Sequence, residues 1–161
     1  MEALVGKINS RQKGAAAERE LIKELQEHLG DEIAGRMKRN LEQSRRGGHD
    51  VAGLPGWAIE VKRYKRLSDA DLNRIWERQV VDQALRVKCR PVLAYKGDFK
   101  PWRVRLPIAL LRDVGDTWVD EWGCRFNWTA DIGLEAFASI VREAHSCTVL
   151  QSVAVPTTIE A

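Results

Sequence analysis

The segment from residue 49 to residue 64 limits the fold most strongly, because two short stretches with alternating apolar and polar residues flank a turn sequence. The pattern predicts a β-hairpin with strands at 49–53 and 57–64 around the turn Leu54-Pro55-Gly56. A three-residue loop places Val51 opposite Ile59, and both side chains then share one apolar face with Val61. The chain should therefore contain a sheet that covers a core on one side.

The remaining pattern places this hairpin in an α/β domain. A helix is predicted over 13–29, ended by Gly30, and a second helix should start at Ser68, whose capping box with Asp71 opens a segment reaching residue 88. The other expected elements are strands at 33–38, 91–95 and 102–106, a basic loop at 39–48, and a helix at 131–145. This order favours a central mixed β-sheet flanked by helices.

The hairpin brings two acidic residues together on its other face. In the predicted register Asp50 lies opposite Glu60, and directly opposed residues have Cβ atoms about 4.5–5.5 Å apart, where like charges repel. Lys62 emerges on the same face two residues further on. The lysine could simply neutralise the acids, or the acids could hold a bound cation.

The first helix adds a third carboxylate. At 100° per residue, Leu21, Ile22, Leu25 and Leu29 form one stripe, and Glu18 falls in its middle, whereas Glu20, Glu24 and Glu27 fall on the opposite side, which we expect to face solvent. A carboxylate on a buried face is costly unless a cation or a donor meets it. A partly solvated position, favoured by the helix dipole, is the alternative for Glu18.

Such a constellation has a chemical use. Two or three carboxylates at a strand pair suit Mg²⁺, which prefers hard oxygen ligands and keeps several waters. A metal ion held there can polarise a phosphoryl oxygen and activate water, and a nearby lysine can orient that water or stabilise developing charge. The chemistry fits phosphodiester hydrolysis.

Three motifs in order resemble a known superfamily. Lys13-Gly-Ala-Ala-Ala-Glu-Arg-Glu20, Gly48-His-Asp50 and Ile59-Glu-Val-Lys62 resemble the PD-(D/E)xK nucleases, and among them the archaeal-type Holliday junction resolvases and their phage-encoded relatives. The resemblance covers about residues 10–105; His49 replaces the proline of the motif. It implies a restriction-endonuclease-like core and a single nuclease domain over 1–161, with a core of about 10–106 and a C-terminal extension, 107–161, of unknown role.

The same resemblance implies roles for individual residues. It makes Glu18, Asp50 and Glu60 ligands of Mg²⁺, for which Mn²⁺ could substitute, and Lys62 the catalytic lysine. It also implies DNA contacts for Arg19 and for Arg36 on the predicted short strand. Basic residues around the hairpin extend the expected DNA-binding surface, although some could be ordinary solvated side chains: Lys13, Arg45, Arg46, Arg63 and Lys65.

Two further sets of residues stay open between structural and functional roles. Gln79 lies at the edge of the apolar stripe of Leu72, Trp76, Val80 and Val87, where it could support the site or satisfy backbone groups at a sheet edge. The tryptophans of the C-terminal segment should pack in the core or an interface, with base stacking as the alternative: Trp118, Trp122 and Trp128.

Charge and composition agree with a nucleic-acid partner. Residues 1–105 contain 23 basic and 15 acidic side chains, while residues 106–161 contain 3 and 8. A basic body favours a polyanion, although solubility alone could explain charges of this size. Three separated cysteines support neither a disulfide framework nor a zinc site, and no apolar run approaches the ~18 residues of a membrane span. We expect a cytoplasmic protein, in the host cytoplasm if phage-encoded.

These observations lead to ranked functions. The first is a Mg²⁺-dependent, structure-specific DNA endonuclease, most simply a homodimeric Holliday junction resolvase of DNA recombination and repair, because symmetric cutting of a four-way junction needs two active sites. The second is a duplex-cleaving, nicking or exonucleolytic enzyme of repair or restriction. The third is a non-catalytic nucleic-acid-binding protein on a nuclease fold.

Overall fold

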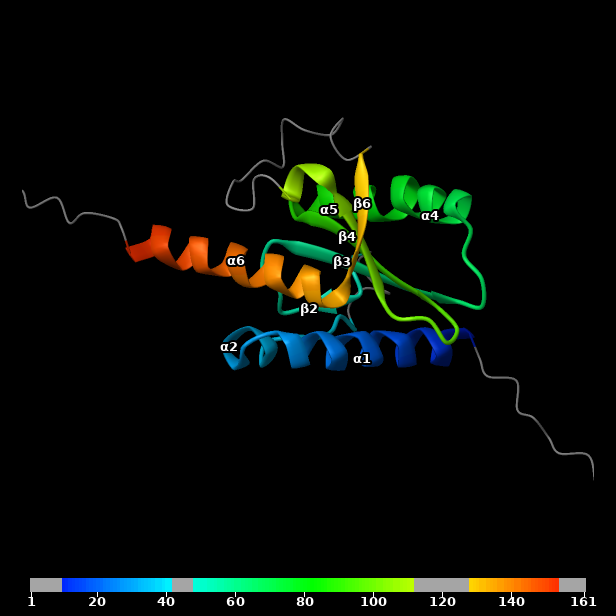
Figure 1. Ribbon diagram of the computed structural model, residues 1–161, viewed down its shortest axis with the longest axis horizontal. Coiled ribbons are helices and arrows are strands. Elements are labelled where there is room, and N and C mark those ends of the chain that lie inside the picture. Colours follow the sequence, from blue (N-terminus) through cyan, green and yellow to red (C-terminus); the bar gives the residue numbers. More distant parts are fainter. Residues whose placement is uncertain (1–9, 42–47, 112–127, 154–161) are drawn as a thin grey trace, which may run out of the picture.

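The computed structural model describes residues 10–41, 48–111 and 128–153, and in this part of the chain a single six-stranded sheet organises the fold (Figure 1). The strands lie in the order of the sequence: β1 (Lys38–Arg39), β2 (Val51–Ala52), β3 (Trp57–Tyr64), β4 (Arg90–Gly97), β5 (Arg103–Pro107) and β6 (Thr129–Gly133). Only the β3–β4 pair is parallel. The predicted class, a mixed sheet flanked by helices, is confirmed.

Two long helices, α1 (Ser10–His28) and α6 (Leu134–Val153), cover one face of the sheet (Figure 1). They share a buried cluster with the strands, in which Leu21, Ile59 and Phe137 are at most 1% exposed. The periodicity of the first helix therefore predicted its buried face correctly. A short helix, α2 (Asp31–Ala34), follows α1 where the sequence predicted part of a strand over 33–38. That expectation is wrong for Ile33, because the segment turns helical and only residues 38–39 pair with β2.

The other face is covered by the connection between the parallel strands. It runs through α4 (Asp69–Ile75), the wider turn η1 (Trp76–Val80) and α5 (Val81–Val87). Ser68 and Asp71 form the predicted capping box. Leu72, Trp76, Val80 and Ala84 are buried at a constant spacing of four, and the wider turn keeps them on one side. Val87, predicted to join this stripe, is exposed.

The hairpin at the centre has the predicted register, since Val51 pairs with Ile59. Its turn depends on Gly53, which has φ of 92°. A Cβ atom there would lie 1.7 Å from the carbonyl oxygen of Arg36, so only glycine lets the turn pass this close to the chain before β1. The backbone that carries Asp50 is thereby fixed against the neighbouring segment.

The C-terminal part differs from the sequence expectation. Residues 131–133 belong to β6, and the helix predicted to begin at Asp131 starts at Leu134 and extends to Val153. A short 3₁₀ helix, η2 (Ile108–Leu111), follows β5. Arg105, 6% exposed, ties β5 to β6 through two hydrogen bonds to Asp131 and to α4 through Asn73. The described residues of this segment therefore complete the same sheet and core.

The tryptophans divide between core and surface. Trp57, Trp76 and Trp102 are buried, whereas Trp128 is 75% exposed. Trp128 therefore does not pack in the core, and an interface or base stacking are the expected roles that remain for it. Trp118 and Trp122 lie outside the described residues.

In the described ranges, the structure has no helix that is long and apolar enough to cross a membrane.

Candidate active site

The four predicted catalytic side chains line one cavity of about 530 Å³. Glu18 comes from α1, Asp50 from the residue before β2, and Glu60 and Lys62 from β3. Residues 18 and 62 are far apart in the sequence, and the packing of α1 against β3 brings them together. The hairpin and the helix predicted separately from the sequence therefore meet at one place.

Asp50 is held by the backbone of β3. Its own N–H donates to the carbonyl oxygen of Ile59 at 2.8 Å, and its Oδ2 accepts the N–H of Val61 at 2.6 Å. The side chain is thus fixed beside Glu60, the residue between those two contacts. With Asp50 only 6% and Glu60 only 4% exposed, the structure places two acidic groups side by side where water has little access.

Lys62 provides the positive charge for this acidic pair. Its Nζ donates to Oε1 of Glu60 at 2.6 Å. Desolvation, the largest contribution, lowers the pKa of Lys62, but the charge and hydrogen bond of Glu60 together with the charge of Asp50 outweigh it and raise the pKa above its usual value. Lys62 is therefore an ammonium at neutral pH, able to stabilise negative charge or donate a proton.

Glu18 meets a cation from the start of the predicted basic loop, a pairing that the sequence did not predict. Its side chain is 16% exposed, and its Oε2 accepts a hydrogen bond from Nε of Arg39 at 2.5 Å. Arg36, the predicted DNA contact, lies elsewhere: it is exposed, forms an ion pair with Glu32 at 3.7 Å and lines a different cavity. The chain turns helical at 31–34, so the strand that reaches the site carries Arg39 instead of Arg36.

The donor set suits a hard divalent cation. Oε2 of Glu60 is buried and has no hydrogen-bond partner in the described structure. Carboxylates of Glu18, Asp50 and Glu60 are the ligand type that Mg²⁺ prefers. Within residues 10–41, 48–111 and 128–153, however, no three Asp, Glu, His or Cys side chains form a preassembled metal site. Arg39 and Lys62 hold two of the carboxylates, and these side chains would have to turn to share an ion.

The predicted DNA contacts are only partly gathered at the cavity. Lys13, Arg63 and Lys65 line it, together with Arg11. Arg19 is exposed on α1 and does not line the cavity. Arg45 and Arg46 lie outside the described residues.

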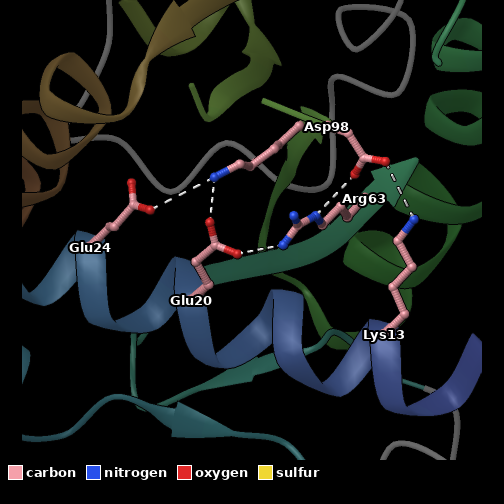
Figure 2. A network of polar contacts seen from close by, with 6 residues as sticks. Lys13, Glu20, Glu24, Arg63 and Asp98 are labelled. Carbon is pink, nitrogen blue, oxygen red and sulfur yellow. Dashed lines mark hydrogen bonds and ion pairs between the residues drawn. The ribbon is translucent and has the colours of Figure 1, made fainter. Parts of the chain in front are cut away.

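Arg63 and Lys13 also belong to an ion-pair network between α1 and the ends of β3 and β4 (Figure 2). Arg63 joins Glu20 at 2.7 Å to Asp98 at 3.4 Å, and Asp98 reaches Lys13 at 3.8 Å. Lys96 pairs with Glu20 as well. Glu20, expected on the solvent side of the helix, is therefore half-buried among cations, because two strand ends reach past the apolar stripe.

Gln79 lies away from these groups. It is exposed on η1 and does not line the cavity. The wider turn keeps Trp76 and Val80 buried and leaves the three residues between them, Gln79 included, facing solvent. The structure therefore does not place Gln79 where it could support the candidate site.

With this geometry established, comparison with known proteins identifies the family. Residues 9–131, which include all four cavity residues named above, match the family described as "Phage putative PDDEXK endonuclease". The chain belongs to this family. This membership in a PDDEXK nuclease family agrees with the sequence resemblance.

One solved structure is also similar. It is Hjc from Archaeoglobus fulgidus, a Holliday junction resolvase from an archaeal hyperthermophile, with 22% sequence identity and a TM-score of 0.39 over 79% of this chain and 97% of that chain. No curated protein sequence matches this PDDEXK nuclease.

Proposed function

We propose that this PDDEXK nuclease is a Mg²⁺-dependent DNA endonuclease in which Glu18, Asp50 and Glu60 hold the metal and Lys62 acts on the reacting phosphate. The observation that carries the proposal is the position of Glu60. Its carboxylate is buried beside Asp50, one oxygen lacks a donor, and the other accepts from Lys62. Such a group is stable when a cation is close and costly when none is.

The residues of this chain divide the work between them. A bound Mg²⁺ would supply Lewis-acid activation of the phosphate and of water. Asp50 is kept in place by the N–H of Val61, and its carboxylate lines the cavity in which the ion would be held. The ammonium of Lys62 can stabilise the charge that develops on the phosphate oxygens. Because Arg39 holds Glu18 by a hydrogen bond, the two side chains would have to shift together or separate for Glu18 to share in holding the ion.

For the substrate, we propose a four-way DNA junction, following the resemblance of the three motifs to Holliday junction resolvases. A junction has two-fold character, so this substrate implies a homodimer with two cavities. Cations at the cavity, among them Lys13, Arg63 and Lys65, would contact phosphates without reading base sequence. Proteins with such contacts bind DNA in a strongly salt-dependent way.

The test compares labelled four-way junction, linear duplex and single strand, each with Mg²⁺ or with EDTA. Paired symmetric nicks in the junction, with little cutting of duplex, are expected. If the linear duplex is cut as fast as the junction, the protein is a general duplex nuclease and not a resolvase. Cleavage in EDTA would reject the requirement for Mg²⁺.

A matched pair of variants tests the site. Glu60→Gln should abolish cleavage, whereas Glu77→Gln, which changes an exposed carboxylate on η1, should leave the rate unchanged. Binding of DNA without any cleavage by the wild-type protein would favour the non-catalytic alternative.

A further inference from the structure

A second hollow adjoins the candidate active site. It has a volume of about 590 Å³ and lies between the end of β3 and the turn that joins β4 to β5. Five of its lining residues are basic and one is acidic: Lys65, Arg66, Lys96, Lys100 and Arg103, with Asp98. Lys65 lines both hollows, so the basic surface continues from one to the other.

Most of this charge is not neutralised. Lys96 pairs with Glu20, and Asp98 is engaged by Lys13 and Arg63. In the part of the chain that the structure describes, Lys65, Arg66 and Lys100 form no ion pair within 4 Å. These side chains therefore create a positive field over the hollow, and a polyanion is the ligand that such a field attracts.

The turn beside the hollow presents an aromatic ring. Phe99 is 102% exposed, so it makes almost no contact within the chain. Its φ is 60°, in the left-handed region that bulky side chains rarely adopt. The turn is closed by a hydrogen bond from Lys100 N–H to the Gly97 carbonyl oxygen at 3.2 Å, and glycine or asparagine is the usual residue at such a position.

The position of Phe99 has no structural explanation in the fold. An exposed phenylalanine gains nothing from burial, and its backbone conformation is unfavourable; strain of this kind is concentrated at functional sites. The turn itself is held firmly, because Asp98 connects it to Lys13 of α1 and Arg63 of β3 (Figure 2). The ring is thus presented to solvent from a fixed base, next to unpaired cations.

We propose that this turn and hollow form a second DNA-binding site, in which Lys65, Arg66 and Lys100 hold the phosphates of one strand and Phe99 stacks on an unpaired base at a branch point. The inference rests on the proposed nuclease function and specifies its substrate as DNA with disrupted pairing. Aromatic stacking tolerates any base, so the site recognises an open base rather than a sequence. In a fully paired duplex every base is already stacked, and Phe99 has no partner.

The test measures binding in EDTA, where cleavage does not interfere. The two ligands are a forked DNA with one unpaired 2-aminopurine at the fork and a duplex of equal length whose ends are closed by non-nucleotide linkers, so that it has no unpaired base. Phe99→Ala should weaken binding to the fork by about tenfold, the effect of one stacked base, and binding to the closed duplex by less than twofold. Phe99→Trp should retain fork binding. Stacking should also change the fluorescence of 2-aminopurine with wild-type protein but not with Phe99→Ala.

The cations have a separate readout. Lys100→Ala should weaken binding to both ligands and reduce the slope of log K against log salt by about one. Wild-type affinity of Phe99→Ala for the fork, an equal loss on both ligands, or an unchanged salt slope for Lys100→Ala would overturn the second site. Any of these results would leave the proposed nuclease function standing, because that function is tested by Mg²⁺-dependent cleavage and its loss in Glu60→Gln. Absence of DNA binding by the wild-type protein would instead reject both the proposed function and this inference.

Discussion

Replacement of Lys62 by methionine removes the only cation whose contact with Glu60 the structure describes. Oε1 of Glu60 then loses its donor at 2.6 Å, and Oε2 has no donor among the described residues to begin with. Removing one partner of a buried ion pair costs about 3–5 kcal/mol. The Lys62 side chain is 21% exposed, so water already screens part of the interaction, and we expect a loss of about 2–3 kcal/mol, which is about 5–10 °C in melting temperature for a domain of this size.

Magnesium should reverse part of this loss. Without the ammonium, the carboxylates of Asp50 and Glu60 are left uncompensated, and a divalent ion held by these two residues would stabilise the folded state. For a dissociation constant of about 1 mM, addition of about 10 mM Mg²⁺ contributes roughly 1.4 kcal/mol. The wild-type protein should gain less, because Lys62 competes for the same oxygens. The readout is stability and does not depend on cleavage.

The difference in stability between wild type and Lys62→Met should depend on pH, because the pKa of Lys62 is raised in the folded protein. A group whose pKa is higher in the folded protein contributes stability below its unfolded value, 10.5, and loses it as the pH rises through the folded value. The difference between wild type and Lys62→Met should therefore be constant from neutral pH to about pH 10 and shrink only above it.

The assay is urea unfolding followed by circular dichroism, in EDTA and in Mg²⁺. Lys65→Met serves as the control, because it removes a neighbouring exposed lysine and should change stability by less than about 0.5 kcal/mol. Equal stability of wild type and Lys62→Met in EDTA, or equal gains from Mg²⁺, would refute the idea that this cavity is built around a cation.

Three other changes test separate parts of the molecule. Asp50→Asn should lower Mg²⁺-dependent cleavage by more than about 100-fold yet change stability by less than about 1 kcal/mol, since the amide oxygen still accepts the same backbone N–H; normal rates in a cleavage assay would reject its role. Asp131→Asn should cost about 2–3 kcal/mol in urea unfolding because the buried guanidinium of Arg105 loses its counter-charge, and a loss below about 1 kcal/mol would contradict this. Phe99→Asn should stabilise the protein by roughly 0.5–1 kcal/mol, since asparagine tolerates the left-handed backbone better; a lower melting temperature would show that the turn is not strained.

Local patterns predicted the centre of the molecule well. The hairpin register was readable because alternation and turn length leave one pairing that keeps Val51 and Ile59 on the apolar face. Helix periodicity placed Glu18 close to the buried stripe, and the Ser68 capping box marked the start of α4. Each of these signals acts within about ten residues, so no knowledge of the tertiary fold was needed.

The errors lie where tertiary contacts decide. The pairing of Arg39 with Glu18 was not predicted, because the sequence cannot show where the chain leaves α2 and which of several basic residues reaches Glu18. The strand at 129–133 was assigned in part to a helix because Asp131 and Gly133 are poor strand formers. Asp131 is tolerated there by its pairing with Arg105 across the sheet, a contact between distant residues.

The anchoring of the β4–β5 turn has a consequence for the products. Asp98 links the turn to α1 and β3, the same two elements that carry the proposed metal ligands Glu18 and Glu60. The protein would then hold the ring of Phe99 and the reacting phosphate at a fixed distance from each other. Incisions should fall at a constant number of nucleotides from the branch, whatever the bases between. Removal of these ion pairs by substitution should distribute the incisions over several neighbouring positions.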